Sequence, residues 1–95
     1  MNEIIVQKFG GTSVGSVERI DAVAEIIKKA SQSNRIVVVV SAMAGETNKL
    51  VNLAKNFSDN PNKREFDALV ATGETVSSAL LAMALHSKGL KAKSY

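Results

Sequence analysis

Cysteine and tryptophan are absent from this 95-residue sequence, and its aromatic side chains are limited to three phenylalanines and one tyrosine. Without cysteine the chain forms neither a disulfide bond nor a thiolate metal site, which is typical of a reducing compartment. Basic residues exceed acidic ones by only 12 to 9, giving a net charge of +3, and they are scattered along the chain. Because a nucleic-acid-binding surface needs clustered basic residues with interleaved aromatic ones, we expect no nucleic-acid partner.

Features of membrane and secreted proteins are also missing. The uninterrupted apolar run at residues 36–40 is far too short to cross a bilayer. The amino terminus carries the acidic Glu3 and passes directly into a β-rich segment, without the basic region and longer apolar region of a signal peptide. We therefore expect no membrane partner and a cytoplasmic location.

Two β-rich segments enclose a helical pattern in the first half of the chain. Residues 36–40 form a continuous β-branched run without alternation, which is typical of a parallel strand covered on both faces, and residues 3–9 form the other β-rich segment. Between them apolar residues recur at helical spacing: Val17, Ile20, Val23, Ala24, Ile27 and Ala30. The pattern predicts a β-α-β unit whose strands are central in a parallel sheet.

The second half of the chain is mainly helical. Thr47 is a plausible N-cap for one helix. Another helix is predicted from Lys63 to about Ala71, with a break near Gly73 and a resumed helix that ends at a Gly89 cap. A last strand should begin near Leu90. The fold class is therefore α/β, with a parallel sheet core of about three strands and no domain boundary within residues 1–95.

A glycine-containing segment between the first strand and the first helix suggests a phosphate site. Gly10 and Gly11 leave backbone N–H groups accessible, and Lys8 adds a positive charge directly before them. Ser16 then opens the helix, whose N-terminus favours an anion. The motif at residues 41–47 follows the second strand, and ligands of open α/β sheets bind beyond such strand ends. We expect the two segments to meet at one edge of the sheet.

The order of the residues differs from the common nucleotide loops, because the lysine precedes the glycines. Lys-Phe-Gly-Gly-Thr-Ser-Val at residues 8–14 resembles the opening signature of aspartate kinases, within the amino acid kinase superfamily. Residues 39–48, with the sequence Val-Val-Ser-Ala-Met-Ala-Gly-Glu-Thr-Asn, and residues 71–74, with the sequence Ala-Thr-Gly-Glu, match further motifs in the expected order. The resemblance covers essentially all 95 residues.

The resemblance implies a fold, a reaction and partners. The fold would be a partial carbamate kinase-like fold with a three-layer α/β/α arrangement, in which residues 1–95 are the N-terminal, truncated part of the kinase domain. The reaction would transfer the γ-phosphoryl group of ATP to the side-chain carboxylate of L-aspartate, giving 4-phospho-L-aspartate for lysine, threonine and methionine biosynthesis. Magnesium would arrive with the nucleotide, since no His/Cys/Asp cluster suggests a protein-held metal. We expect a homo-oligomer, and an inactive fragment when these residues are isolated.

The phosphate side of the site is expected to involve the first motif. Lys8 is the catalytic candidate, because a fixed ammonium stabilises the negative charge that gathers on the transferred phosphoryl group. Gly10, Gly11, Thr12 and Ser13 are the other candidates for binding the nucleotide. The two hydroxyls can instead cap the helix that follows.

The substrate side is expected to involve Ser41, Thr47 and Glu74. In the family that the chain resembles, hydroxyls at the first two positions contact aspartate, and the glutamate binds its α-ammonium group. Two of the three have a structural alternative: Thr47 can serve as an N-cap, and Glu74 can be a first-turn acidic residue that favours the helix dipole.

Two other functions are alternatives to an aspartate kinase. Another amino acid kinase, acting on glutamate, a uridylate or carbamate, could share the glycine loop, although the motifs at Thr47 and Glu74 argue against it. The chain could also be a non-catalytic module that associates with itself through an unpaired sheet edge.

Overall fold

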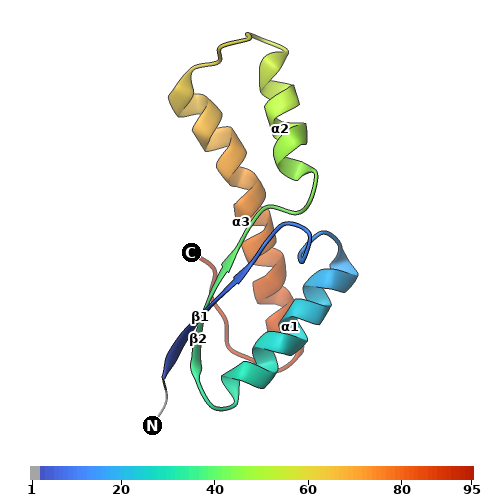
Figure 1. Ribbon diagram of the computed structural model, residues 1–95, viewed down its shortest axis with the longest axis vertical. Coiled ribbons are helices and arrows are strands. Elements are labelled where there is room, and N and C mark those ends of the chain that lie inside the picture. Colours follow the sequence, from blue (N-terminus) through green and yellow to red (C-terminus); the bar gives the residue numbers. More distant parts are fainter. Residues whose placement is uncertain (1–2) are drawn as a thin grey trace.

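The computed structural model describes residues 3–95 and begins with a parallel β-α-β unit (Figure 1). Strand β1 spans Ile4–Phe9 and strand β2 spans Arg35–Val40, and helix α1, Val17–Ser31, connects them. The strands pair in parallel from Ile4 opposite Arg35 to Phe9 opposite Val40. The predicted β-α-β unit is confirmed, and its short strand segments lie where the β-rich runs indicate.

Helix α1 begins at the predicted residue and buries the middle of the predicted stripe, whereas Val17 at its start is 71% exposed. Ser16 is extended, and its hydroxyl oxygen accepts a 3.2 Å hydrogen bond from the backbone N–H of Arg19. This bond satisfies one of the N–H groups that a helix start leaves unpaired. The inward face of the helix consists of Ile20, Val23, Ala24 and Ile27.

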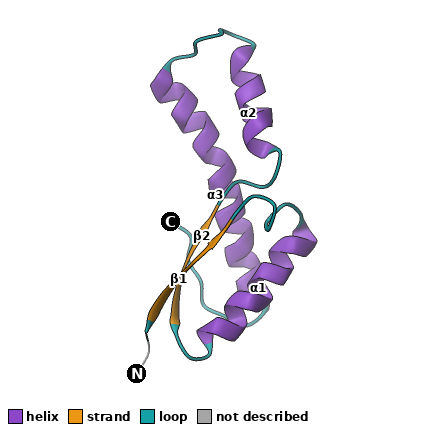
Figure 2. Ribbon diagram, in the orientation of Figure 1, coloured by secondary structure: helices purple, strands orange, loops and turns teal. Residues whose placement is uncertain are grey.

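The sheet is covered on one face only within residues 3–95. Figure 2 shows the two strands next to α1 and the second half of α3. Inward residues of β2 such as Val38 pack on the core, whereas Val37 and Val39 are 50% and 47% exposed. The prediction of strands covered on both faces is therefore wrong for the described residues. Because the helices that cover the sheet lie on one side of it, the described part has two layers rather than three, although the α/β class is confirmed.

Helices α2, Glu46–Lys55, and α3, Lys63–Ser87, form an antiparallel pair that extends beyond the sheet (Figure 1). We call α2, the turn at 56–62 and the first half of α3 the arm. No residue of α2 is fully buried, and Phe57 in the turn is 92% exposed. The second half of α3 belongs to the core instead, where Leu81 and Leu85 pack with Val14 and the α1 residues.

Helix α3 runs through Gly73 without interruption, so the predicted break is wrong. Glycine in a helix interior costs about 1 kcal/mol relative to alanine, which explains why the sequence favours a break. The structure shows a packing reason for the glycine: a Cβ atom there would lie 2.9 Å from the Cβ of Ala42. Close approach of two chain segments, rather than a turn, accounts for Gly73.

The end of α3 follows the predicted glycine cap. Gly89 has a φ of +84° and donates a 3.0 Å hydrogen bond to the carbonyl of His86, while Leu90 donates one of 3.1 Å to Leu85. This pair of bonds is a Schellman motif. Residues 90–95 then pass along β2, but they do not form the predicted third strand. Leu90 and Ala92 pack on the core, and His86 Nε2 lies 2.7 Å from the carbonyl oxygen of Ala92. These contacts, rather than backbone hydrogen bonds to β2, hold the segment.

By length and composition alone, α3 is apolar enough to cross a membrane. Core helices of soluble proteins pass the same test, and α3 contributes Leu81 and Leu85 to the core. Only 22% of its most apolar stretch is buried within the structure. The expectation of no membrane partner therefore stays a prediction.

Candidate functional site

The segments that follow β1 and β2 meet at the carboxyl edge of the sheet, as the sequence predicts. The N–H of Ser41 donates a 3.1 Å hydrogen bond to the carbonyl of Phe9, which extends the strand pairing by one step. The N–H of Ala44 donates another, also 3.1 Å, to the carbonyl of Gly11. The first bond joins the ends of the two strands, and the second joins residues 10–16, which we call the glycine loop, to residues 41–45, which we call the β2 loop.

The two adjacent glycines have different roles. A Cβ atom at Gly11 would lie 2.8 Å from the carbonyl oxygen of Ala42, so close packing with the β2 loop requires glycine there. A Cβ atom at Gly10 would meet nothing within 4 Å. Protein packing therefore explains Gly11, whereas the open space at Gly10 is what a ligand approaching the backbone needs.

Thr12 and Ser13, two of the three hydroxyl residues of the glycine loop, are exposed. The loop is folded by two turns, in which Ser13 N–H donates to the Gly10 carbonyl at 3.1 Å and Gly15 N–H donates to the Thr12 carbonyl at 3.3 Å. Helix α1 is capped by Ser16, so neither Thr12 nor Ser13 serves as its cap. Among residues 3–95 neither hydroxyl has a hydrogen-bond partner, which leaves both available to a bound anion.

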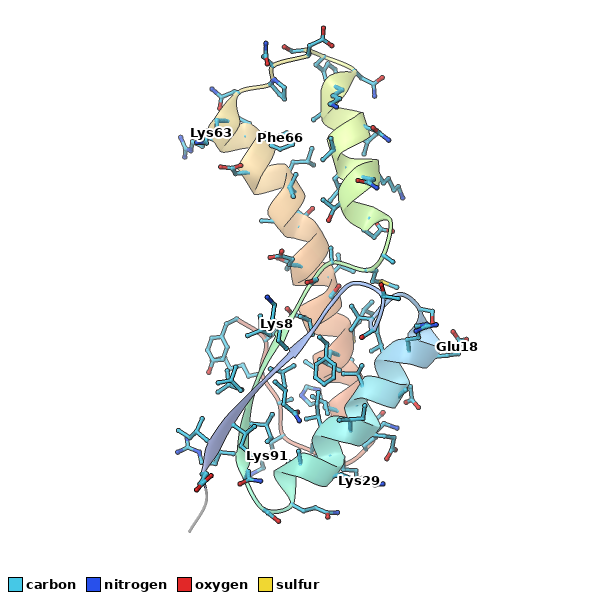
Figure 3. The ribbon with its side chains drawn as sticks, in the orientation of Figure 1. Lys8, Glu18, Lys29, Lys63, Phe66 and Lys91 are labelled. Atoms are coloured by element: carbon cyan, nitrogen blue, oxygen red, sulfur yellow. The ribbon has the colours of Figure 1, made fainter. Side chains whose placement is uncertain are left out.

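Lys8 lies one residue before the end of β1, opposite Val39. Its side chain is exposed, and the alternation along β1 places it with Ile4 and Val6 on the uncovered face of the sheet. Figure 3 shows the labelled lysine on the side of the strands that faces away from α1. Lys8 makes no ion pair with any residue that the structure describes, so its charge is free to act on a ligand.

Two helices begin at this edge of the sheet, which makes it favourable for anions. Helix α2 starts after Gly45, whose φ is +87°, and no side chain caps it. Thr47 is the second residue of the helix, so its predicted role as N-cap is wrong, because the chain turns two residues earlier at a glycine. An uncapped helix start leaves N–H groups free, and the helix dipole adds positive potential at this edge of the sheet.

Glu74 reaches the same edge from the third segment. It is exposed and lies in the middle of α3, which begins at Lys63, so the first-turn alternative is wrong. Its neighbour Gly73 packs against Ala42 of the β2 loop. The buried hydroxyl of Ser77, one turn further along, donates a 3.3 Å hydrogen bond to the Gly73 carbonyl.

The predicted residues thus divide into two groups around the β2 loop. Lys8, Gly10, Gly11, Thr12 and Ser13 come from β1 and the glycine loop, Ser41 lies half-buried at the end of β2, and Thr47 and Glu74 lie on the arm. The described residues contain no cluster of three or more His, Cys, Asp or Glu side chains that would hold a metal ion. An edge that offers a free lysine and open N–H groups, together with the carboxylate of Glu74 on α3, suits an anion and a zwitterion held next to each other.

Sequence reasoning missed the residues that hold these groups together. Ala42, Gly15 and Gly73 are small because they pack against one another's segments, and Ala42 is only 7% exposed. A glycine within an otherwise regular helical pattern was the available signal, because such a glycine usually has a packing reason. The partner of that glycine lies 31 residues away in the numbering and carries no comparable signal.

Comparison with known proteins identifies relatives of the whole chain. The model of the amino acid kinase family matches residues 3–95. The chain is 63% identical over 92 residues to an aspartokinase of Geobacillus stearothermophilus, which corresponds to 96% of this chain and 23% of that protein. It therefore spans about a quarter of the length of this relative.

Solved structures share the fold. The structure of aspartate kinase from Synechocystis superposes with a TM-score of 0.87 at 59% identity, covering 90% of this chain and 15% of that one. The structure of E. coli aspartokinase III in complex with aspartate and ADP superposes with a TM-score of 0.77 at 28% identity, covering 95% of this chain and 30% of that one.

Proposed function

The chain belongs to the amino acid kinase family, and from this membership we propose that the full-length protein is an aspartate kinase. It would transfer the γ-phosphoryl group of ATP to the side-chain carboxylate of L-aspartate. The observation that carries the proposal is the meeting of three segments at one sheet edge. A free lysine, an open glycine and the N-terminus of α1 lie on one side of the β2 loop, and Thr47 at the N-terminus of α2 and Glu74 on α3 lie on the other. The names of the relatives support aspartate as the acceptor.

On the phosphate side, charge stabilisation is the proposed chemistry. The ammonium group of Lys8 would interact with the oxygens of the transferred phosphoryl group, where negative charge gathers in the transition state. The accessible backbone at Gly10 and the hydroxyls of Thr12 and Ser13 would donate hydrogen bonds to the phosphates. Gly11 would act indirectly, by permitting the close contact with the β2 loop.

On the acceptor side, we propose that three polar residues bind aspartate. Ser41 and Thr47 would donate hydroxyl hydrogen bonds, and the carboxylate of Glu74 would accept a charge-assisted bond from the α-ammonium group. Lys8 and Glu74 carry opposite charges and come from different segments. The positive charge suits a phosphate, and the negative charge suits the ammonium group of an amino acid that lies beside it.

Magnesium fits this scheme as an ion that the nucleotide brings. The groups at the edge are mainly cationic or N–H donors, which suit phosphate oxygens rather than a bare cation. The bound ion would neutralise phosphate charge. The residues of this chain would bind and orient the phosphates around it.

We also propose that residues 1–95 in isolation lack kinase activity and associate with themselves. The uncovered sheet face carries four large apolar side chains that are 47% to 64% exposed, namely Ile4, Val6, Val37 and Val39. A contiguous apolar face of this kind favours association in water. Light scattering of the isolated chain over a concentration series should show a rising mass, whereas a strictly monomeric chain with micromolar ATP affinity would contradict this proposal.

The test of the function is a phosphorylation assay on the full-length protein with an acceptor panel. L-aspartate should be phosphorylated at its side chain in preference to L-glutamate, carbamate and uridylate. Preference for one of the other acceptors would replace the proposal with another activity of the family.

We further propose that the reaction takes place in the cytoplasm of the cell, in a homo-oligomer, and supplies lysine, threonine and methionine biosynthesis.

A further inference from the structure

Helix α3 touches the β2 loop at a contact between two very small residues. A Cβ atom built on Gly73 would lie 2.9 Å from the Cβ of Ala42 and 3.5 Å from Cδ1 of Leu50. Carbon atoms in good contact are about 3.5–4 Å apart, so even a methyl group at Gly73 does not fit unless the β2 loop or the helix moves. The Ala42 side chain therefore fixes how closely the helix approaches the loop.

Ala42 is also held from the opposite side. Its carbonyl oxygen would lie 2.8 Å from a Cβ atom at Gly11, and two residues later Ala44 is hydrogen-bonded to the Gly11 carbonyl. The β2 loop is thus confined between the glycine loop and α3. A displacement of α3 cannot be absorbed by an empty space on the other side, because Ala42 is only 7% exposed.

The rotation of α3 at this contact is fixed as well. Ser77 is 1% exposed, lies one helical turn after Gly73, and donates its hydroxyl to the Gly73 carbonyl. Gly73 and Ser77 therefore share the buried side of the helix. Glu74, the next residue after Gly73, is consequently held at a defined angle to the β2 loop.

We propose that Ala42 and Gly73 are positioning residues, whose contact sets the distance between Glu74 on α3 and Ser41 at the end of β2. The inference rests on the proposed function, since it assigns to these two residues the alignment of the acceptor groups. Neither residue touches the substrate in this account. Each acts through its chain neighbour, Ala42 next to Ser41 and Gly73 next to Glu74.

The proposal predicts a specific kinetic pattern for Gly73→Ala in the full-length protein. The added methyl should push α3 away from the β2 loop and raise the KM for aspartate about tenfold or more, because small misplacements of binding groups are costly. The KM for ATP should change far less, since the glycine loop meets Ala42 at its carbonyl oxygen and Gly73 meets it at its side chain. Alanine is also the better helix former, so a loss of aspartate affinity would not reflect a weakened helix.

A compensating substitution makes the test decisive. Ala42→Gly removes the methyl group that the new one meets, so the Ala42→Gly/Gly73→Ala double variant should regain most of the aspartate affinity that Gly73→Ala loses. Additive effects of the two substitutions on the aspartate KM would overturn the proposal, and so would an unchanged KM in a folded Gly73→Ala variant. If Gly73→Ala alone fails to fold, recovery of both folding and aspartate KM in the double variant supports the proposal, and failure to recover either contradicts it.

A matched control separates positioning from helix stability. Ala71→Gly exchanges the same two residue types in the reverse direction, at an exposed position of α3 two residues before the contact. It should weaken the helix and leave the KM for aspartate nearly unchanged. The unmodified protein, assayed alongside, tests the proposed function separately, because failure to phosphorylate aspartate would reject that function. The coupling between positions 42 and 73 does not depend on this activity. It can also be measured from the unfolding temperatures of the unmodified protein, the two single variants and the double variant.

Discussion

The sheet with α1 and the second half of α3, which we call the base, differs from the arm in how each is packed. Every fully buried large apolar residue of the described core belongs to the base or to the glycine loop, including Val14, Ile27 and Leu81. In the arm, α2 has no fully buried residue and Leu53 remains 49% exposed. Regions with few buried apolar contacts open at lower free energy than a packed core.

The candidate site lies where these two regions join, and its groups are divided between them. Lys8 belongs to the base and the glycine loop packs on it through Val14, whereas Thr47 and Glu74 belong to the arm. The comparison therefore suggests that the phosphate-binding groups are fixed by the core, and that the acceptor-binding groups depend on the single close contact between the β2 loop and α3.

The largest effect is expected at Lys8. Lys8→Ala in the full-length protein should lower kcat about 10²–10³-fold with a much smaller change in the KM for aspartate, because the ammonium acts on charge that develops during transfer. Steady-state kinetics measure both quantities. Lys8→Arg should recover only part of the rate, since a planar guanidinium replaces a compact charge. An undiminished kcat in Lys8→Ala would remove the residue from the mechanism.

The difference in packing predicts unequal costs for the same truncation. Leu81→Ala removes a side chain that is 3% exposed and should lower the free energy of unfolding by about 2–5 kcal/mol. Leu53→Ala in the arm should cost less than about 1 kcal/mol, since half of that side chain is already in water. Denaturant unfolding of the two variants of the full-length protein gives the comparison. Equal losses would show that the arm is packed as firmly as the base.

Glu74→Gln should weaken the binding of the acceptor, aspartate, without affecting the binding of ATP. The loss of one charge-assisted hydrogen bond, about 1.5–3 kcal/mol, should raise the KM for aspartate roughly tenfold or more and leave the KM for ATP nearly unchanged. Glu65→Gln is the matched control, because Glu65 lies in the first turn of the same helix, far from the loop contact. Similar increases in both Michaelis constants would assign Glu74 a structural role instead.

A smaller, pH-dependent effect is expected within the base. Lys88 bridges Glu25 at 2.8 Å and Asp21 at 2.9 Å, which joins the end of α3 to α1. The hydrogen bond and charge of Lys88 hold the pKa of Glu25 below its ordinary value of 4.5. A carboxyl group whose pKa is lowered by folding stabilises the folded state at pH values above its unfolded-state pKa. This stabilisation is lost as the pH falls through the pKa that the group has in the folded state.

Lys88→Met should therefore reduce the unfolding temperature slightly at neutral pH, and this reduction should fade as the pH falls through the lowered pKa of Glu25, because below it the carboxyl is protonated in both states. Because Glu25 is 56% exposed, solvent screening keeps the effect small. Thermal unfolding followed across this pH range checks the prediction. A difference between the two proteins that grows on acidification would contradict the assigned sign.

The local parts of the fold and the site were predictable from sequence. Helical spacing and the Ser16 cap located α1, and two β-rich runs located the strands, because these signals depend on neighbouring residues. The meeting of the glycine loop with the β2 loop followed from parallel pairing alone.

The remaining features depend on partners distant in sequence. Gly73 looked like a helix break because its propensity cost is local, whereas its compensation is a contact with Ala42. Gly45, rather than Thr47, is the N-cap of α2, because the chain turns there in a left-handed backbone conformation. The run at residues 36–40 suggested cover on both faces, yet Val37 and Val39 remain exposed within residues 3–95 because nothing in the run specifies which faces are packed.

The most direct test of the division between base and arm is amide hydrogen exchange of the full-length protein with each ligand separately. ATP with magnesium should protect the glycine loop, residues 10–16, with little change in the arm. L-aspartate should protect residues 41–47 and the part of α3 around Glu74. If both ligands protected the same segments, or if aspartate left the arm unchanged, the assignment of phosphate binding to the base and acceptor binding to the arm would be wrong.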